Sequence, residues 1–303
     1  MAPTPTLDET RVTDRIRAHI AMMKPRIIEL LLVTAIPTMF LAAQGLPSLR
    51  SAIAVLVGGA AAAAAANTFN SVYDRDIDAV MARTHDRPLA RGAVSLRAGV
   101  IQGVLLTAIA VIVLALLTNL LAAALGLLAI ALYSIGYTMI LKRRTAQNIV
   151  WGGAAGCMPV LIAWAAITGT LSWTPVVLFL VVFFWTPPHY WPLAMKYRQE
   201  YQQAGIPMLP VVATDAVVAR QIIAYSWVMA AVSLALVPVA GMGPVYLVGA
   251  VALGALFLVL AYRVRSAVAS ADLDRRAMRL FHGSITYLAV LFLLVGVDPF
   301  LGG

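Results

Sequence analysis

The chain has 303 residues, of which 62% are hydrophobic and 12% are charged, and its formal net charge is +9. Its mean hydropathy of +0.89 excludes an ordinary soluble domain, because such domains are only about half apolar and carry about twice this share of charged residues. The composition therefore predicts a polytopic membrane protein.

Nine apolar segments are long enough to cross a bilayer as helices, since a crossing needs about 20 predominantly apolar residues. They are residues 27–44, 51–70, 98–117, 120–140, 148–169, 173–192, 219–241, 244–262 and 280–298. The sequence thus predicts an all-α membrane protein with nine transmembrane helices. It divides into a polar N-terminal segment, residues 1–23, and a membrane domain, residues 24–303.

The basic residues alternate in position with these segments. Of the 22 Lys and Arg residues, 21 lie before the first span or in every second loop, and Arg50 is the exception. Because Lys and Arg accumulate on the cytoplasmic side, the N-terminus is predicted to lie in the cytoplasm and the C-terminus outside. Most of the positive charge reports orientation and contact with the lipid bilayer, so it indicates no nucleic-acid partner.

A polar cluster follows the second apolar segment. On a helix, Asn70, Asp74 and Asp78 occupy positions i, i+4 and i+8 and share one face. Neighbouring carboxylates repel one another at a membrane boundary, so a divalent cation between them would stabilise the arrangement. Oxygen-only ligands indicate Mg²⁺, which shares its coordination with substrate phosphates. Asp76 falls on another face and either supports this site or is simply solvated.

Further basic residues are predicted to lie in the same compartment. Arg83 and Arg87 follow the aspartates, and Lys142 and Arg143 end the fourth span. Lys142 and Arg143 either bind phosphate or contact lipid headgroups.

A proline-rich stretch, residues 185–192, ends the sixth span. Its three prolines predict a broken or unwound helix, which at this depth is tolerated only where it is buried or lines a cavity. Polar and aromatic candidates for substrate contact come directly after it: Lys196, Tyr197, Arg198, Glu200 and Tyr201.

Together these features suit an anionic diphosphate joined to an apolar chain. The metal and the basic side chains would hold the diphosphate, while the chain lies among apolar helices. Loss of the diphosphate would give an allylic cation that an electron-rich acceptor captures. The protein would support this cation electrostatically and exclude water from it.

Several motifs resemble a known family. Asn70-x3-Asp74-x3-Asp78 followed by Met81-x-Arg83-Thr84-x-x-Arg87-Pro88-Leu89 resembles the first aspartate-rich motif of the intramembrane (UbiA-type) prenyltransferases. Further stretches resemble the protoheme IX farnesyltransferases, or heme O synthases, within that superfamily: Lys24-Pro-Arg-Ile, Tyr137-Thr through Lys142-Arg143 with Asn148-Ile and Gly152-Gly153, Pro187-Pro-His189-Tyr-Trp, and Glu200-Tyr201-x-x-Ala204-Gly-Ile-Pro-Met-Leu-Pro210. The resemblance extends from Lys24 to the ninth span.

This resemblance implies nine helices around a central cavity with a cytoplasmic cap, in a bacterial inner membrane. The implied reaction joins farnesyl diphosphate to a vinyl group of heme B and adds water, which gives heme O; heme B is then a substrate rather than a cofactor. Asn70, Asp74 and Asp78 would hold Mg²⁺ and act in catalysis. The implied diphosphate contacts are Arg83, Arg87, Lys142 and Arg143. Heme A synthase or oxidase assembly factors are the implied protein partners.

The sequence departs from the superfamily pattern at one place. Many members have a second aspartate-rich motif after the sixth span, whereas residues 196–201 contain Glu200 as their one acid. Lys196 and Arg198 are therefore predicted to meet the diphosphate or a heme propionate directly. His189 is either a heme contact or a hydrogen-bond partner of a freed backbone carbonyl, and His282 is expected to have a structural role at the interface.

Three alternatives stay open. The acceptor could be a quinone-type aromatic ring or a chlorophyll precursor instead of heme. The chain could be an ion-coupled transporter, although transporter acids usually lie near the bilayer midplane on broken helices. It could also bind heme without catalysis. The length of the prenyl chain cannot be read from the sequence, because it depends on the depth of a cavity.

Overall fold

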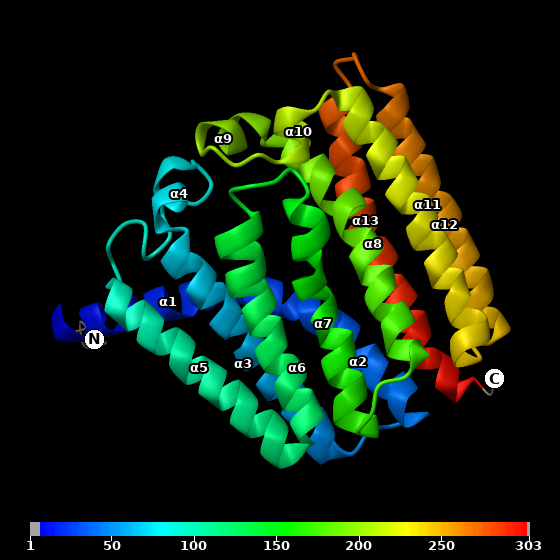
Figure 1. Ribbon diagram of the computed structural model, residues 1–303, viewed down its shortest axis with the longest axis horizontal. Helices are drawn as coiled ribbons and strands as arrows, with labels where there is room; N and C mark the ends of the chain where they lie inside the picture. Colours follow the sequence, from blue (N-terminus) through cyan, green and yellow to red (C-terminus); the bar gives the residue numbers. More distant parts are fainter. Residues whose placement is uncertain (1–6, 302–303) are drawn as a thin grey trace, which may run out of the picture.

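The computed structural model describes residues 7–301, and every regular element within that range is a helix (Figure 1). The long elements are α2 (Pro25–Ala43), α3 (Leu49–Tyr73), α5 (Leu96–Leu117), α6 (Leu120–Ala131) with the π-helix η1 (Leu132–Leu141), α7 (Asn148–Thr168), α8 (Trp173–Lys196), α11 (Asp215–Ala240), α12 (Pro244–Ser266) and α13 (Leu273–Val297). The remaining elements are α1 (Leu7–Met23), α4 (Arg75–Val80), α9 (Arg198–Gln203), α10 (Leu209–Val212) and the 3-10 helix η2 (Asp298–Phe300). The all-α prediction is confirmed.

Eight helices in the described part of the chain are long and apolar enough to cross a membrane. They are α3, α5, α6 continued by η1, α7, α8, α11, α12 and α13 continued by η2, and they match the second to ninth predicted spans. α2 matches the first predicted span, but its described apolar stretch, Leu31–Ala43, is shorter than a full crossing. The transmembrane character is therefore confirmed, whereas the count of nine stays a prediction.

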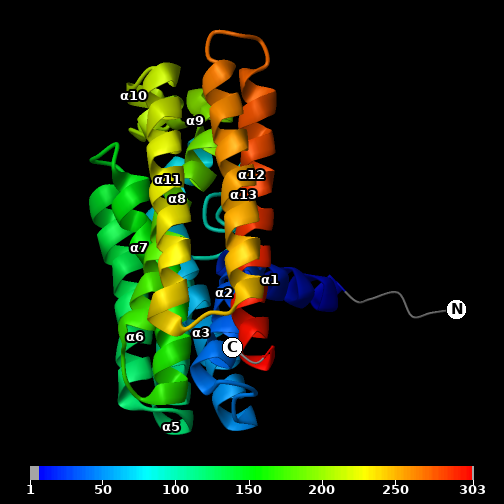
Figure 2. The same ribbon diagram turned by 90° about the vertical axis from the view of Figure 1, so that its right-hand side faces the viewer.

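Small residues bring the long helices close together. α3 packs along α5, and α2 packs against both α7 and α13. A Cβ atom added at Gly103 of α5 would lie 2.6 Å from the ring of Phe69 on α3, and one added at Gly58 would lie 2.7 Å from Leu114. Glycines at such contacts let two backbones approach, as is usual in membrane helix packing. The bundle that results is seen from two sides in Figures 1 and 2.

α1 lies across the bundle instead of along it (Figure 2). Its buried residues Ala18 and Met22 pack with Leu89 and Val94. The predicted polar segment, residues 1–23, is thus helical from Leu7 onward, and residues 1–6 lie outside the described part.

Two loops fold over one end of the bundle, where α4, α9 and α10 gather (Figure 1). Ile77 and Met81 from the loop after α3 share a buried apolar cluster with Tyr201, Ile206 and Met208 from the loop after α8. These contacts bring together two segments that lie far apart in the sequence. That this end faces the cytoplasm stays a prediction.

The prediction of a broken sixth span is wrong. α8 continues without interruption from Trp173 to Lys196, with Pro187, Pro188 and Pro192 inside it. Neighbouring helices support a proline-containing helix at membrane depth, and α8 packs against α7, α11 and α13. The indole nitrogen of Trp185 also donates to the Ser284 carbonyl oxygen of α13 at 2.8 Å.

The fourth predicted span ends in a π-helix, which the sequence did not predict. Over Leu132–Leu141 the backbone widens, and the Thr138 hydroxyl donates to the Tyr133 carbonyl oxygen at 2.8 Å. π-helical turns within α-helices are frequent at functional sites. Here the turn holds Tyr133 and Tyr137 with their ring centroids 5.5 Å apart.

Candidate active site

The three predicted metal ligands lie at the α3–α4 junction. Asn70 is in the last turn of α3, Asp74 ends that helix, and Asp78 follows in the short helix α4. They are therefore not on one continuous helix as the spacing predicts, yet the backbone turn keeps all three buried at the same end of the bundle. The Asn70 amide nitrogen donates to Asp74 Oδ2 at 2.7 Å and to the Thr138 hydroxyl at 3.1 Å.

Each of these three side chains has a cationic partner from another segment. Lys142 forms an ion pair with Asp74, and Arg87 Nη1 lies 2.7 Å from Asp78 Oδ1. Lys24 Nζ donates to Asn70 Oδ1 at 2.5 Å. Pairing of this kind is what makes burial of the carboxylates possible.

Lys24 comes from the connection between α1 and α2 and was not among the predicted site residues. Burial, followed by the neighbouring charge of Arg87, lowers the pKa of Lys24 to about 7. The ammonium group is thus poorly solvated and close to other cations. The sequence signal was the Lys-Pro-Arg stretch before the first span, which the resemblance included without giving Lys24 a role.

Arg143 contacts Asp76 and Tyr73 more closely than it contacts Asp74. Both of its terminal nitrogens lie 2.8 Å from the two carboxylate oxygens of Asp76, and its guanidinium stacks over the ring of Tyr73 with 4.8 Å to the centroid. This hydrogen bonding lowers the pKa of Asp76 to about 2. Arg143 does not line the cavity described below, and it approaches Asp74 Oδ1 only to 3.5 Å. Its geometry is that of a residue that positions the α3–α4 junction.

Arg83 belongs to a second polar group, which it forms with tyrosines of α8 and of the loop after it. Its guanidinium donates to the Tyr201 hydroxyl at 3.1 Å and lies over the rings of Tyr197 and Tyr201. The Tyr201 and Tyr190 hydroxyls are 2.9 Å apart. Burial raises the pKa of Tyr201, so this hydroxyl stays neutral.

Three further predicted contacts lie away from the cavity. The side chain of Lys196 is 5.5 Å from the ring centroid of Tyr197, and Arg198 forms an ion pair with Asp215 at the start of α11. Glu200 Oε2 is buried without a hydrogen-bond partner among the described residues.

The histidines are also separated from the cavity. His189 stacks between Trp185 and Phe281, and its Nδ1 lies 2.6 Å from the Ser284 hydroxyl oxygen. His282 is exposed and its Nδ1 lies 2.7 Å from the Met278 carbonyl oxygen. Of the two roles considered for His189, this geometry resembles hydrogen bonding within the helix bundle, although its partner is a side chain.

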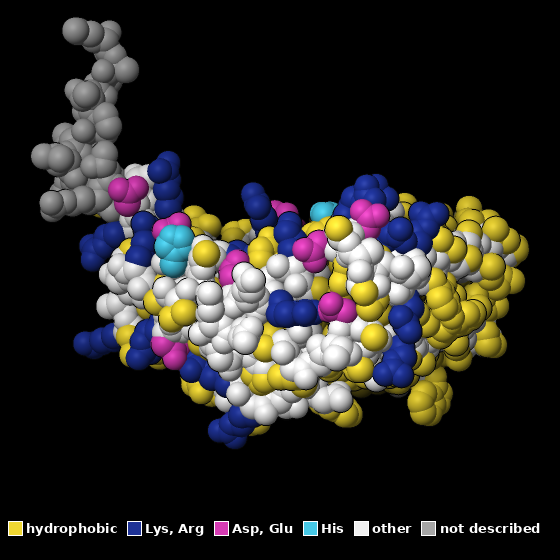
Figure 3. Space-filling view, turned by 90° about the horizontal axis from the view of Figure 1, so that it is seen from above, with side chains coloured by type: hydrophobic (Ala, Val, Ile, Leu, Met, Phe, Trp, Pro, Cys, Tyr) yellow, Lys and Arg dark blue, Asp and Glu magenta, His cyan; other side chains and the backbone are white. Residues whose placement is uncertain are grey.

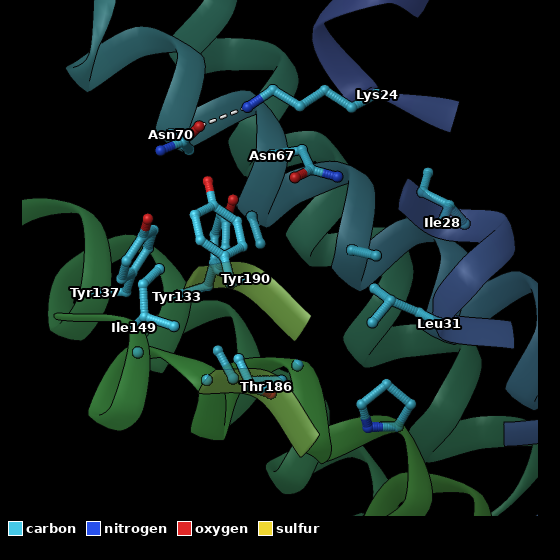
Figure 4. A pocket seen from close by; sticks show the side chains of 18 of the residues that line it. Lys24, Ile28, Leu31, Asn67, Asn70, Tyr133, Tyr137, Ile149, Thr186 and Tyr190 are labelled. Carbon is cyan, nitrogen blue, oxygen red and sulfur yellow. Dashed lines mark hydrogen bonds between the residues drawn. The ribbon is translucent and has the colours of Figure 1, made fainter. Parts of the chain in front are cut away.

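The polar side chains of the α3–α4 junction lie at one end of a cavity of about 460 Å³, a volume within the range typical of small-molecule sites. Asn70, Asp78, Arg83, Arg87 and Lys142 line it, whereas Asp74 is fully buried beside them. Figure 4 shows Lys24 reaching Asn70, with the hydroxyl groups of Tyr133, Tyr137 and Tyr190 directed toward the same end. The three tyrosines were not among the predicted site residues.

The rest of the cavity is apolar. α2 contributes Ile28, Leu31 and Leu32, and α3 and α7 contribute mostly alanine, glycine and isoleucine. The cavity thus joins a charged end to an apolar interior, the shape that an apolar chain with an anionic head requires.

Oxygen ligands for a metal are present only in part. In the described part of the chain, no three His, Cys, Asp or Glu side chains group as a metal site. Asp74 Oδ1, however, is a buried carboxylate oxygen with no hydrogen-bond partner among residues 7–301. Together with Asp78 it fits a hard cation such as Mg²⁺ that also binds substrate oxygens, because Mg²⁺ takes one or two protein carboxylates and shares the rest of its coordination.

The exposed surface above this site is rich in charge. Figure 3 views that end of the molecule and shows Lys and Arg side chains interspersed with Asp and Glu. A separate recess near the α12–α13 connection is lined by Leu260 and four arginines: Arg263, Arg275, Arg276 and Arg279. Two of them, Arg275 and Arg276, pair with Asp272.

Comparison with known proteins identifies the family. Residues 31–285 match the model of the UbiA prenyltransferase family. The chain is 53% identical over 291 residues to protoheme IX farnesyltransferase of Streptomyces avermitilis, covering 95% of both chains. It is 54% identical over 283 residues to the protein of the same name from Frankia alni, covering 93% of this chain and 98% of that one.

Solved structures agree on the fold. A structure of digeranylgeranylglyceryl phosphate synthase aligns with a TM-score of 0.78 at 14% identity and covers 94% of this chain and 98% of its own. A UbiA homologue from Archaeoglobus fulgidus, bound to GPP and Mg²⁺, aligns with a TM-score of 0.59 at 16% identity, with coverages of 92% and 99%. The helix bundle, the cavity and these matches lead to one conclusion: the chain belongs to the UbiA prenyltransferase family.

Proposed function

We propose that this protein transfers the farnesyl group of farnesyl diphosphate to a vinyl group of heme B, with addition of water, and so produces heme O and diphosphate. The observation that carries the proposal is the cavity, because carboxylates paired with cations lie at one end of it and the rest of its lining is mostly apolar. Relatives named protoheme IX farnesyltransferase, about half identical over nearly the whole chain, support heme as the acceptor.

Asp74, Asp78 and Asn70 are the residues that would hold Mg²⁺. The Asn70 side chain contacts both Asp74 and Lys24. A bound Mg²⁺ supplies electrostatic stabilisation of the diphosphate leaving group. The solved homologue with GPP and Mg²⁺ supports this assignment, since it shares the fold of this chain.

The cations at the polar end of the cavity would bind the diphosphate oxygens. Lys24, Arg87 and Lys142 line the cavity and each donates to one of the oxygen-bearing side chains. Arg83 also lines the cavity, and its guanidinium donates to the Tyr201 hydroxyl. Charge-assisted hydrogen bonds from such groups hold a diphosphate in a fixed orientation.

The chemistry then follows from charge. The bond between C1 of the farnesyl group and the diphosphate oxygen breaks, the electron pair leaves with the diphosphate, and an allylic cation remains. The rings of Tyr133, Tyr137 and Tyr190 lie at this end of the cavity and can stabilise a cation through their π faces. The apolar walls exclude water from the cation until the acceptor arrives.

The heme vinyl group is the nucleophile. Its terminal carbon forms the new carbon–carbon bond, which leaves a positive charge on the carbon attached to the porphyrin. Water adds there and loses a proton, so the product carries a hydroxyethylfarnesyl group. Atoms and charge balance with diphosphate as the released group.

A transporter is disfavoured by the continuous helix α8. Secondary transporters place their binding sites on discontinuous helices near the bilayer midplane. In this protein the carboxylates lie at the end of α3, and the proline-rich helix is unbroken.

The test uses purified protein in detergent with heme B, Mg²⁺ and radiolabelled farnesyl diphosphate, followed by reverse-phase separation of the hemes. We expect a labelled, late-eluting heme that EDTA abolishes. Asp74→Asn should lower turnover by more than about a hundredfold, because it weakens the charge stabilisation at the diphosphate. Asp86→Asn is the matched control, since Asp86 is exposed in the same loop. If heme B stays unlabelled but a quinone precursor becomes labelled, the acceptor is a quinone precursor and not heme B.

The orientation is proposed as well. We infer that the N-terminus and the polar end of the cavity face the cytoplasm, from the alternation of basic residues. Single cysteines introduced at Asp86 and Arg50, in a Cys157→Ala background, should react with a membrane-impermeant maleimide from opposite sides of the membrane. Labelling of both from one side would contradict this orientation.

A further inference from the structure

The apolar part of the cavity can be measured along α3. Its lining residues on that helix fall on one face and run from the polar end inward as Asn70, Asn67, Ala66, Ala63, Ala62, Gly59 and Val55. At a rise of about 1.5 Å per residue, Gly59 lies about 16 Å and Val55 about 22 Å from Asn70 along the helix axis. Position along α3 therefore corresponds to depth in the cavity.

α7 forms a second wall of the cavity, and its chain runs away from the polar end whereas that of α3 runs toward it. Ile149 lies near the polar end, as Figure 4 shows, and Gly156 and Ile162 follow deeper along the helix. Ile162 belongs to the same buried apolar cluster as Val55 and Ala35, which also line the cavity. These three side chains, from α7, α3 and α2, close its deep end.

The glycines that line the cavity are of two kinds. A Cβ atom added at Gly152 would lie 2.2 Å from the Tyr137 ring, and one added at Gly153 would lie 2.9 Å from Thr186. Packing therefore explains both glycines. A Cβ atom added at Gly59 or Gly156 would meet nothing within 4 Å.

Helix packing therefore does not explain why Gly59 and Gly156 lack side chains. Glycine inside a helix is destabilising relative to alanine in host–guest measurements. Both residues have helical backbone and keep partial access to open space. Because they also line the cavity, the space in front of them is part of it.

We propose that Gly59 and Gly156 provide the space for the last isoprene unit of the donor, and that they set the maximum prenyl length together with the closing residues Val55 and Ile162. The inference rests on the proposed use of a prenyl diphosphate held at the Asn70 end. With the diphosphate fixed there, an extended farnesyl chain reaches the depth of Gly59 and Gly156. A geranyl chain, one unit shorter, ends before them.

The first test fills this space. Gly59→Leu and Gly156→Leu are assayed with farnesyl and geranyl diphosphates as competing donors to heme B. We expect the ratio of kcat/KM for farnesyl over geranyl to fall by about tenfold to a hundredfold, the range for a few methylene groups in an apolar pocket. Gly156→Ala, whose added Cβ meets no atom, should fold normally and give a smaller fall. Val57→Phe is the control, since Val57 is exposed on the same helix.

The second test removes the closing residues. Ile162→Ala and Val55→Ala should allow geranylgeranyl diphosphate to serve as donor, which the unchanged protein should use poorly. General damage to the fold would lower the use of every donor alike. An unchanged donor ratio in folded Gly156→Ala and Gly156→Leu, or no gain in the use of geranylgeranyl diphosphate relative to farnesyl diphosphate in folded Ile162→Ala, would overturn the inference.

The outcome separates this inference from the proposed function. Binding of geranyl and farnesyl diphosphates with Mg²⁺ is measured by calorimetry without any acceptor. If heme B is not prenylated but Gly156→Leu still weakens farnesyl binding relative to geranyl binding, the acceptor is wrong and the length assignment holds. If heme O forms, but Gly156→Leu changes neither the relative affinities for farnesyl and geranyl diphosphates nor the donor ratio, only the length assignment fails.

Discussion

The ion pair between Lys142 and Asp74 should make a larger contribution to stability than the pair between Arg87 and Asp78. The Asp74 side chain is fully buried and that of Lys142 is 12% exposed, whereas the Arg87 side chain is 33% exposed. Lys142→Met would leave a buried carboxylate without its nearest cation. Arg87→Met would leave the Asp78 carboxylate, whose side chain is only 4% exposed but, unlike that of Asp74, lines the cavity.

Breaking a buried pair costs 3–5 kcal/mol, and Asp74 keeps its hydrogen bond from Asn70, so we expect Lys142→Met to cost about 3 kcal/mol. For Arg87→Met, solvent screening reduces the expected cost to about 1 kcal/mol. The quantity to measure is the free energy of unfolding in mixed detergent micelles, without substrate. Asp74→Asn added to Lys142→Met should recover part of the loss, because no unpaired charge then remains.

Equal destabilisation by Lys142→Met and Arg87→Met would refute the argument from burial. A double variant, Lys142→Met with Asp74→Asn, that is less stable than Lys142→Met alone would also refute it. Asp86→Asn serves as the baseline, since that side chain is 89% exposed and should change stability little.

Two further predictions concern the cavity walls. Tyr201→Phe removes the hydroxyl that Arg83 and Tyr190 share, so we expect a higher KM for farnesyl diphosphate with a nearly unchanged Tm; an unchanged KM would remove Arg83 from the proposed diphosphate contacts. Gly152→Ala would place a methyl group 2.2 Å from the Tyr137 ring and should destabilise the protein by about 1–3 kcal/mol and lower kcat/KM, whereas Gly136→Ala, which meets nothing within 4 Å, should do neither in the same unfolding and turnover assays.

The sequence predicted the helices well because membrane spans depend on local composition. Apolar length alone located eight of the described helices, with the largest error at the start of α13, which begins at Leu273 rather than at residue 280. The polar spacing of Asn70, Asp74 and Asp78 identified the end of α3 as the candidate site. The family resemblance is confirmed by the comparisons. The roles of the individual site residues stay predictions.

What the sequence missed depends on contacts between distant segments. Lys142 and Asp74 are 68 residues apart, and nothing in either segment indicates that Lys142 rather than Arg143 reaches Asp74 most closely. Arg198 was predicted to meet substrate, but its partner Asp215 lies on the next long helix. The prolines of α8 would break an isolated helix, and only the packing of three neighbouring helices explains why they do not.

The pairing of every oxygen-bearing ligand with a cation has a consequence for selectivity. Diphosphate binding alone would bring further negative charge close to Asp74 and Asp78. Mg²⁺ binding alone would separate Lys142 and Arg87 from their carboxylates and leave both cations without a new partner. If Mg²⁺ and diphosphate bind here together as proposed, Lys142 and Arg87 would pair with the phosphates and Asp74 and Asp78 would hold the metal, with little change in net charge. Each ligand then raises the affinity for the other by the same factor. The proposed function therefore implies a site that binds free Mg²⁺ and simple anions weakly and binds magnesium and diphosphate together.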